Sequence, residues 1–168
     1  MNDAHLHMVV NHFPIIGTIL GLGILIAGFI FKNNTIKNTA YSLFVVGAIF
    51  SAVSMATGEG AERMVEDMPS VGHHIIHEHE EIAEKLAIVM YLLGIASIIG
   101  FYMNIKENAK AKMVSFVVLV LALGATVLGK SVGTSGGEIR HTEIREASAS
   151  NTTGVEAQEK ESHEEHEE

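Results

Sequence analysis

The chain has no cysteine and no tryptophan, and its 168 residues include only two prolines. The absence of cysteine excludes disulfides, zinc–thiolate sites, iron–sulfur ligation and covalent attachment of a c-type haem. Basic residues are also scarce, since 11 Lys and Arg face 20 Asp and Glu and the formal net charge is −9. This acidic balance argues against nucleic acid as a partner, because a phosphate backbone selects for positive charge.

Four long apolar stretches stand out, and ionisable residues are nearly absent within them, with His12 and Lys130 near the ends. Each stretch is close to the ~20 residues that a helix needs to cross about 30 Å of hydrocarbon. The sequence therefore predicts an all-α fold, an integral membrane four-helix up-and-down bundle. Its helices are expected at about 11–31, 39–57, 80–103 and 113–134.

The predicted bundle forms one transmembrane domain over residues 1–145. Its first apolar segment is expected to be a transmembrane helix and not a cleaved signal peptide. A signal peptide would require a basic region before the segment and a small-residue cleavage site after it, and neither is present. The connection that starts at Gly58 is expected to hold short helical pieces broken at Pro69 and Gly72. Residues 146–168 are small, polar and acidic, and are predicted to be disordered.

The two short connections between the predicted helices carry lysines, in "FKNNTIKNT" and "NIKENAKAK". Lys and Arg in short loops favour the cytoplasmic side, whereas acidic residues contribute little. We therefore expect a multi-pass protein of the bacterial cytoplasmic (inner) membrane, with the lysine-bearing connections in the cytoplasm and both termini in the periplasm. The lipid bilayer is its first expected partner.

The histidines are distributed asymmetrically along this topology. Those at the periplasmic end are His5, His7 and His12 at the first helix, His73, His74, His77 and His79 before the third, His141 after the fourth, and His163 and His166 in the tail. None falls in the segments that are predicted to lie in the cytoplasmic half of the bundle. This clustering is the main functional signal, because an ionisable group at a membrane segment is a candidate functional residue.

His12 and His79 are the first candidates for a shared site, because the first and third helices of an up-and-down bundle face each other diagonally. Each heads an apolar stripe, formed by Ile16, Ile19 and Gly23 after His12 and by Ala83, Leu86, Met90 and Gly94 after His79. Two opposed imidazoles above small residues are what axial ligation of a b-type haem requires. His7 competes with His12 for the inner position, since their spacing turns them onto different helix faces.

Charged residues near the same end are further candidates. Glu59 could fix an imidazole tautomer by accepting its N–H, or could ligate a non-haem metal directly. Lys130, Arg63 and Arg140 could neutralise haem propionates. Glycines at the end of the fourth helix would either admit a flat cofactor or allow close helix packing.

A metal ion without porphyrin, Zn, Cu or Fe, is the alternative interpretation of these residues. The candidate ligands of such a site are His7, His12, Glu59, His79, His77 and His141. His77 also forms i, i+4 pairs with His73 and Glu81, which share one helical face. In the third interpretation, the histidines only occupy the membrane boundary and hold no ligand.

Four stretches of the chain resemble a family of bacterial predicted membrane proteins classed as a domain of unknown function. "HMVVNHFPI" is similar to the family's His–x4–His opening and "ATGEGAERMVEDMP" to the acidic motif that closes its second helix. "HEEIAEKL" is similar to its His and Glu before the third helix, and "GTSGG" to its small-residue motif after the fourth. The matching positions are His7, His12, Glu59, His79 and Glu81.

This resemblance covers residues 6 to about 140. Thr134 stands where some relatives have a histidine, so a ligand at that position is lost here or replaced by His141. Members of the family joined to Rieske-type or cytochrome-type domains imply a role in electron transfer.

The expected function is that of a small membrane-bound b-type cytochrome-like electron-transfer protein. A His-ligated haem b near the periplasmic face would relay electrons between quinol and a respiratory-chain or other redox partner. The alternatives are a non-haem metal-binding membrane protein and an accessory structural subunit of a larger membrane complex. The sequence has no nucleophilic triad, phosphate loop or hydrolytic carboxylate pair, so an independent enzyme is the less favoured class.

Overall fold

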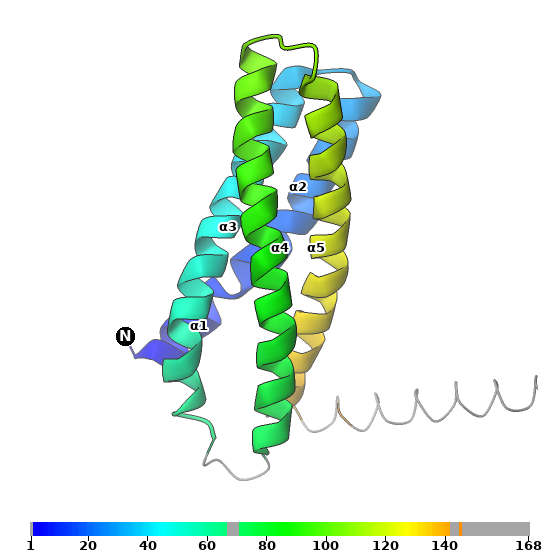
Figure 1. The fold of residues 1–168 in the computed structure, drawn as a ribbon. Coiled ribbons are helices and arrows are strands. Elements are labelled where there is room, and N and C mark those ends of the chain that lie inside the picture. Colours follow the sequence, from blue (N-terminus) through cyan, green and yellow to red (C-terminus); the bar gives the residue numbers. More distant parts are fainter. Residues whose placement is uncertain (1, 67–70, 142–144, 146–168) are drawn as a thin grey trace, which may run out of the picture.

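The computed structural model describes residues 2–66, 71–141 and 145, without the side chain of Arg140. Within these residues the chain forms five α-helices: α1 (Asp3–Val10), α2 (His12–Ile30), α3 (Asn34–Glu62), α4 (His73–Ile105) and α5 (Ala111–Arg140). The four long helices, α2 to α5, run up and down along one bundle (Figure 1). The predicted all-α four-helix bundle is confirmed.

Successive long helices are neighbours in the bundle: α2 packs against α3, α3 against α4 and α4 against α5, and α5 closes on α2. The helices α2 and α4 therefore lie diagonally across the core. The two short connections meet at one end of the bundle, whereas α1, the end of α3, the start of α4 and the end of α5 lie at the other (Figure 1). The lysine-bearing connections and the described histidines thus occupy opposite ends.

The outer surface of the bundle is apolar on every long helix. Leu20 on α2, Ile98 on α4 and Val127 on α5 are 58%, 57% and 68% exposed. Water would oppose so much exposed apolar surface, whereas hydrocarbon accepts it, and a helix satisfies its own backbone hydrogen bonds. Four candidate spans, the first running from α1 through α2, are long and apolar enough to cross a bilayer. The protein is a multi-pass membrane protein that contacts lipid.

The core is built from side chains that each long helix turns inward. Its buried members are Leu25, Ala40, Tyr41, Phe44, Leu86, Met90, Leu93, Val118, Ala122 and Ala125. Glycines set the helix spacing: a Cβ on Gly94 would lie 2.7 Å from the Ala48 Cβ, and one on Gly21 would lie 2.5 Å from the Phe44 ring. Small residues allow this close approach, which supplies packing energy where lipid cannot drive association.

The helices extend beyond the apolar stretches that predicted them. Helix α3 continues past Gly58 to Glu62, and α4 begins at His73, directly after its N-cap Gly72. Backbone hydrogen bonding does not stop where apolar composition stops, so hydropathy locates the hydrocarbon crossing rather than the helix end. The predicted break at Pro69 and the predicted disordered tail at 146–168 lie outside the described residues.

An additional short helix, α1, precedes the first predicted span and is separated from α2 at Asn11. Pro14 explains the break, because a proline nitrogen cannot donate and its ring collides with the carbonyl four residues earlier, here that of Val10. The carbonyl of Met8, next to the break, accepts a hydrogen bond from Nδ1 of His12 at 3.0 Å. Helix α1 then turns away from α2 and packs against α3 (Figure 1).

The two short connections share one backbone design. In each, the residue after the C-cap adopts a left-handed conformation, Lys32 and Glu107 both with φ of 49°. The next residue, Asn33 or Asn108, donates its N–H back to the carbonyl of Gly28 or Met103 at 3.0 Å. This is a Schellman ending, which usually places glycine at the left-handed position. A residue with a side chain costs roughly 1–2 kcal/mol more than glycine in this conformation. Lys32 and Glu107 therefore each carry this conformational cost.

Candidate functional site

His7 projects from α1 toward α3 and is half-buried there. Its Nδ1 lies 3.0 Å from the Ser54 carbonyl oxygen and 3.2 Å from Oγ1 of Thr57. A carbonyl oxygen only accepts hydrogen bonds, so this contact assigns the proton to Nδ1. The other ring nitrogen, Nε2, then carries a free lone pair.

His79 is held in the same way by α5. Its Nδ1 lies 2.9 Å from Oγ of Ser135, and that hydroxyl lies 3.2 Å from the Val132 carbonyl, to which it donates. Because the hydroxyl proton is used, Ser135 accepts from His79, and Nδ1 again carries the ring proton. Gly136 lets the imidazole sit directly on α5, since a Cβ there would lie 3.0 Å from Cε1 of His79.

The imidazoles of His7 and His79 lie at the same end of the bundle. They come from α1 and α4 and are held there by hydrogen bonds to α3 and α5 (Figure 1). The hydroxyl-bearing residues that hold them, Thr57 and Ser135, are buried. The result is a pair of oriented imidazoles, each with its Nδ1 bonded to protein and its Nε2 lone pair available.

Of the two candidates for the inner position on the first span, His12 is the one that faces outward. His12 is exposed and bonds the Met8 carbonyl of its own chain segment, and the stripe predicted to continue into the core points outward, with Ile16 and Ile19 53% and 50% exposed. The buried face of α2 is instead Pro14, Thr18, Gly21, Leu25 and Gly28. The predicted stripe on α4 does lie inside, since Leu86, Met90 and Gly94 are buried.

The described charged candidates are exposed, and no hydrogen bond joins Glu59, Arg63, Lys130 or His77 to His7 or His79 in the part of the chain that the structure describes. Glu59 and Arg63 pair with each other, with side chains 75% and 70% exposed. Lys130 is exposed on α5, and His77 is exposed with its Nε2 3.5 Å from Glu81. His141 is exposed, and its N–H caps α5 by donating to the Gly137 carbonyl at 3.0 Å. The side chain of Arg140 lies outside the described part of the structure.

The glycines near the end of α5 serve helix packing. Gly129 and Gly133 both face Ile15 of α2, and α5 continues through Gly136 and Gly137 as regular helix. No group of three or more His, Asp or Glu side chains suited to a metal ion occurs among residues 2–66, 71–141 and 145.

The residues that orient the imidazoles were not predicted from the sequence. Ser51, Ser54 and Thr57 recur every third residue within the apolar stretch of α3, and this spacing is the signal that could have identified Ser54 and Thr57. Polar side chains within a membrane helix face the bundle interior, where partners are found. They therefore mark the face of α3 that receives His7.

Comparisons with protein-family models, with curated proteins and with solved structures find no match for this chain.

Proposed function

We propose that the protein is a small membrane cytochrome-like electron-transfer protein that holds a b-type haem between His7 and His79. The observation that carries this proposal is the shared arrangement of the two imidazoles. Each has Nδ1 bonded to an oxygen of the neighbouring helix and Nε2 left with a free lone pair. Metal-ligating histidines typically have this arrangement, because the hydrogen bond at one ring nitrogen fixes the tautomer and raises the basicity of the other.

The number of ligands favours haem over a bare metal ion. A structural zinc ion requires four ligands from protein side chains, and a catalytic one requires three. The described residues offer two oriented imidazoles and no third ligand beside them. A b-type haem needs no more than two, because the porphyrin supplies the other four.

The chain's own residues would perform three tasks at such a site. His7 and His79 would bind the iron, Ser54, Thr57 and Ser135 would keep the rings in one orientation, and the surrounding helices would limit access of water. When bound, haem supplies reversible one-electron transfer at a potential that axial ligands, hydrogen bonds and burial adjust. Fixed ligands suit electron transfer, because the protein has little to rearrange when the charge changes.

The same proposal includes an orientation. The lysine-bearing connections would face the cytoplasm of a bacterium, as short basic loops do, which puts the imidazole pair near the periplasmic face of the inner membrane. A haem there would exchange electrons with quinol in the bilayer and with a respiratory-chain or periplasmic partner.

The experiment is an absorption spectrum of the purified full chain, oxidised and then reduced with dithionite, with metal analysis of the same sample. We expect a Soret band and sharp α and β bands on reduction. His7→Ala and His79→Ala should each abolish these bands, while His12→Ala serves as the matched control and keeps them. Ser135→Ala should weaken haem retention by roughly tenfold, as loss of a ligand's hydrogen-bond partner does.

The alternatives are separate outcomes of this measurement. A protein without porphyrin bands that carries stoichiometric zinc, copper or iron would replace the haem proposal with a metal site. A protein with neither would support the accessory-subunit interpretation. Bands lost in His12→Ala but kept in His7→Ala would contradict the assignment of the ligands.

A further inference from the structure

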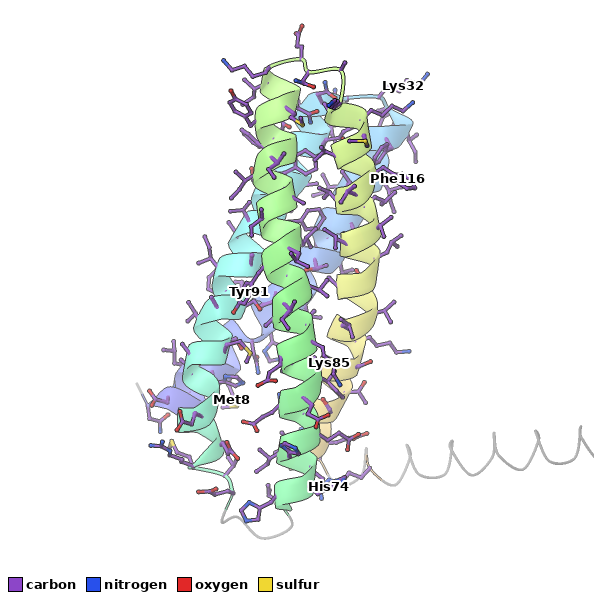
Figure 2. The ribbon with its side chains drawn as sticks, viewed as in Figure 1. Met8, Lys32, His74, Lys85, Tyr91 and Phe116 are labelled. Carbon is purple, nitrogen blue, oxygen red and sulfur yellow. The ribbon has the colours of Figure 1, made fainter. Side chains whose placement is uncertain are left out.

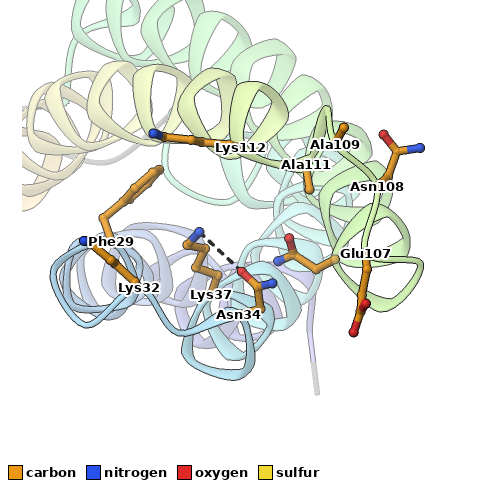
Figure 3. A pocket seen from close by; sticks show the side chains of 10 residues that line it. Phe29, Lys32, Asn34, Lys37, Glu107, Asn108, Ala109, Ala111 and Lys112 are labelled. Atoms are coloured by element: carbon orange, nitrogen blue, oxygen red, sulfur yellow. Dashed lines mark hydrogen bonds between the residues drawn. The ribbon is translucent and has the colours of Figure 1, made fainter.

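At the end of the bundle opposite the histidines, the two short connections border an open cavity of about 610 Å³ (Figure 3). This volume falls within the ~300–1,000 Å³ typical of small-molecule sites. Its lining comes from α2, α3, the end of α4 and the start of α5, and includes three lysines, Lys32, Lys37 and Lys112. Lys32 lies at this end of the bundle, far from Met8 and His74 (Figure 2). The cavity is therefore separate from the imidazole pair.

Lys37 is the decisive residue, because it is buried although it carries an ammonium group. Only 8% of it is exposed, and Nζ has two neighbours, Oδ1 of Asn34 at 3.4 Å and the Phe29 ring at 5.0 Å. Its stem rests against Gly28, where a Cβ would lie 2.7 Å from its Cγ. No carboxylate pairs with Lys37 among the ion pairs of the described residues. Burial of a charge is costly unless an opposite charge accompanies it.

The surroundings do not supply that opposite charge. The two connections and the adjoining helix ends hold five lysines, Lys32, Lys37, Lys106, Lys110 and Lys112, and a single acid, Glu107. Glu107 lines the cavity, but its carboxylate turns away from the space into which Lys37 points (Figure 3). The lining thus holds three lysines and one acid, together with Asn34, Asn104 and Asn108, and the side chain of Lys37 points into the space (Figure 3).

The rim of the cavity is also held in place at a conformational cost. Lys32 and Glu107, the left-handed residues of the two connections, both line it. Outliers of this kind persist where the surrounding structure requires them, and they are concentrated at ligand sites. The backbone of these two residues therefore fixes the position of the rim, whereas the Glu107 side chain points away from the cavity (Figure 3).

We propose that this cavity binds a phosphate group, with Lys37 as its inner ligand and Lys32 and Lys112 at its mouth. A phosphate can come from the headgroup of an anionic phospholipid or from a free phosphate ion, and the cavity's position at the end of a membrane-spanning bundle favours the headgroup. Basic pockets between membrane helices bind anionic lipids in this way. The proposal does not depend on the haem site at the other end.

The test measures lipid binding to the purified full chain in detergent by native mass spectrometry at physiological ionic strength. The probes are phosphatidylglycerol and phosphatidylcholine with identical acyl chains. We expect phosphatidylglycerol to bind at least about tenfold more tightly, because both lipids offer the phosphate but the choline cation of phosphatidylcholine is repelled by the lysines of the cavity. Lys37→Met, which keeps a straight apolar side chain against Gly28, should remove this preference.

Two double variants provide a test that does not depend on the folding of Lys37→Met. They also show whether the lipid binds the cavity or is attracted to the positively charged surface in general. Lys32→Met with Lys112→Met removes two exposed lysines that line the cavity, and Lys106→Met with Lys110→Met removes two exposed lysines that do not. Both lower the charge of this end equally. The lining pair should weaken phosphatidylglycerol binding roughly tenfold and the other pair less than about threefold.

A second arm distinguishes the two sources of phosphate. Inorganic phosphate is added at constant ionic strength, and the midpoint of thermal unfolding is followed in the wild type and in Lys37→Met. A rise confined to the wild type shows that the cavity takes free phosphate, and no rise together with selective phosphatidylglycerol binding shows that it takes the headgroup. The proposal is overturned if the protein binds phosphatidylglycerol no more tightly than phosphatidylcholine, or if the two double variants weaken phosphatidylglycerol binding equally.

Discussion

Replacing Gly21 with alanine should destabilise the bundle, although alanine is the better helix former. A Cβ at this position would lie 2.5 Å from Cε1 of Phe44 and about 3 Å from two more atoms of the same ring edge. The ring is fully buried, so it has no free space into which it can withdraw. Overpacking of this kind costs ~1–3 kcal/mol, and the helix propensity gained returns roughly 0.5–1 kcal/mol. The expected net loss is about 0–2.5 kcal/mol, with a central value of about 1 kcal/mol.

Gly23 provides the matched control, because it lies two residues further along the same helix on the exposed face. No atom lies within 4 Å of its Cβ position. Gly23→Ala should therefore leave stability unchanged or raise it by up to ~1 kcal/mol. The assay is reversible unfolding in mixed micelles, with helix content followed by circular dichroism as the fraction of denaturing detergent rises.

A double-mutant cycle identifies the collision partner. In a Phe44→Leu background the rigid ring edge is gone, so Gly21→Ala should cost at least ~1 kcal/mol less than in the wild type. Equal effects of the Gly21 and Gly23 variants would refute the reasoning. An unchanged cost of Gly21→Ala in the Phe44→Leu background would show that the contact between α2 and α3 lies elsewhere.

Two further predictions use introduced cysteines, a pair in the first and single ones in the second, which are labelled selectively because the chain has none of its own. Pro14→Ala should let α1 and α2 join into one helix and swing α1 away from α3, which lengthens the distance between spin labels at Met8 and Met64 by roughly 5 Å, given that α1 spans ~12 Å. An unchanged distance would mean that packing on α3, rather than the proline, sets the break. A cysteine at His74 in intact cells should react with a membrane-impermeant maleimide, whereas one at Lys106 should react only after lysis. The reverse pattern would invert the proposed orientation.

The case of α2 shows where reasoning from sequence fails for this molecule. In water a helix reveals its buried face by hydrophobic periodicity, but a membrane helix is apolar on both faces. By composition, Ile16 and Ile19 are therefore as suitable for the core as Thr18 and Leu25. The stripe that was predicted to face the core faces lipid instead. The α4 stripe was placed correctly because Met90 and Gly94 combine a flexible side chain with a small one, which suits helix contacts.

The histidine site was predicted only in part, for a related reason. His79 was the correct residue on α4 for an inward position, whereas the choice between His7 and His12 depended on the path of the chain before Pro14. A continuous helix would separate the two histidines by a fixed rotation, but the break at Asn11 changes that rotation. His7 thereby reaches Ser54 on α3, and His12 stays outside.

Features that depend on composition along the chain could be predicted from the sequence. Runs of apolar residues long enough to cross hydrocarbon predicted the four spans, and short lysine-bearing connections alternating with histidine-bearing segments predicted that these residues occupy opposite ends. The folded structure was needed to show which face of α2 is buried, that α1 turns His7 onto α3, and that Lys37 is buried with no carboxylate paired to it among the described residues. These features depend on the distance and rotation between helices, which are set by contacts such as Gly21 with Phe44 and Gly94 with Ala48 between residues far apart in the sequence.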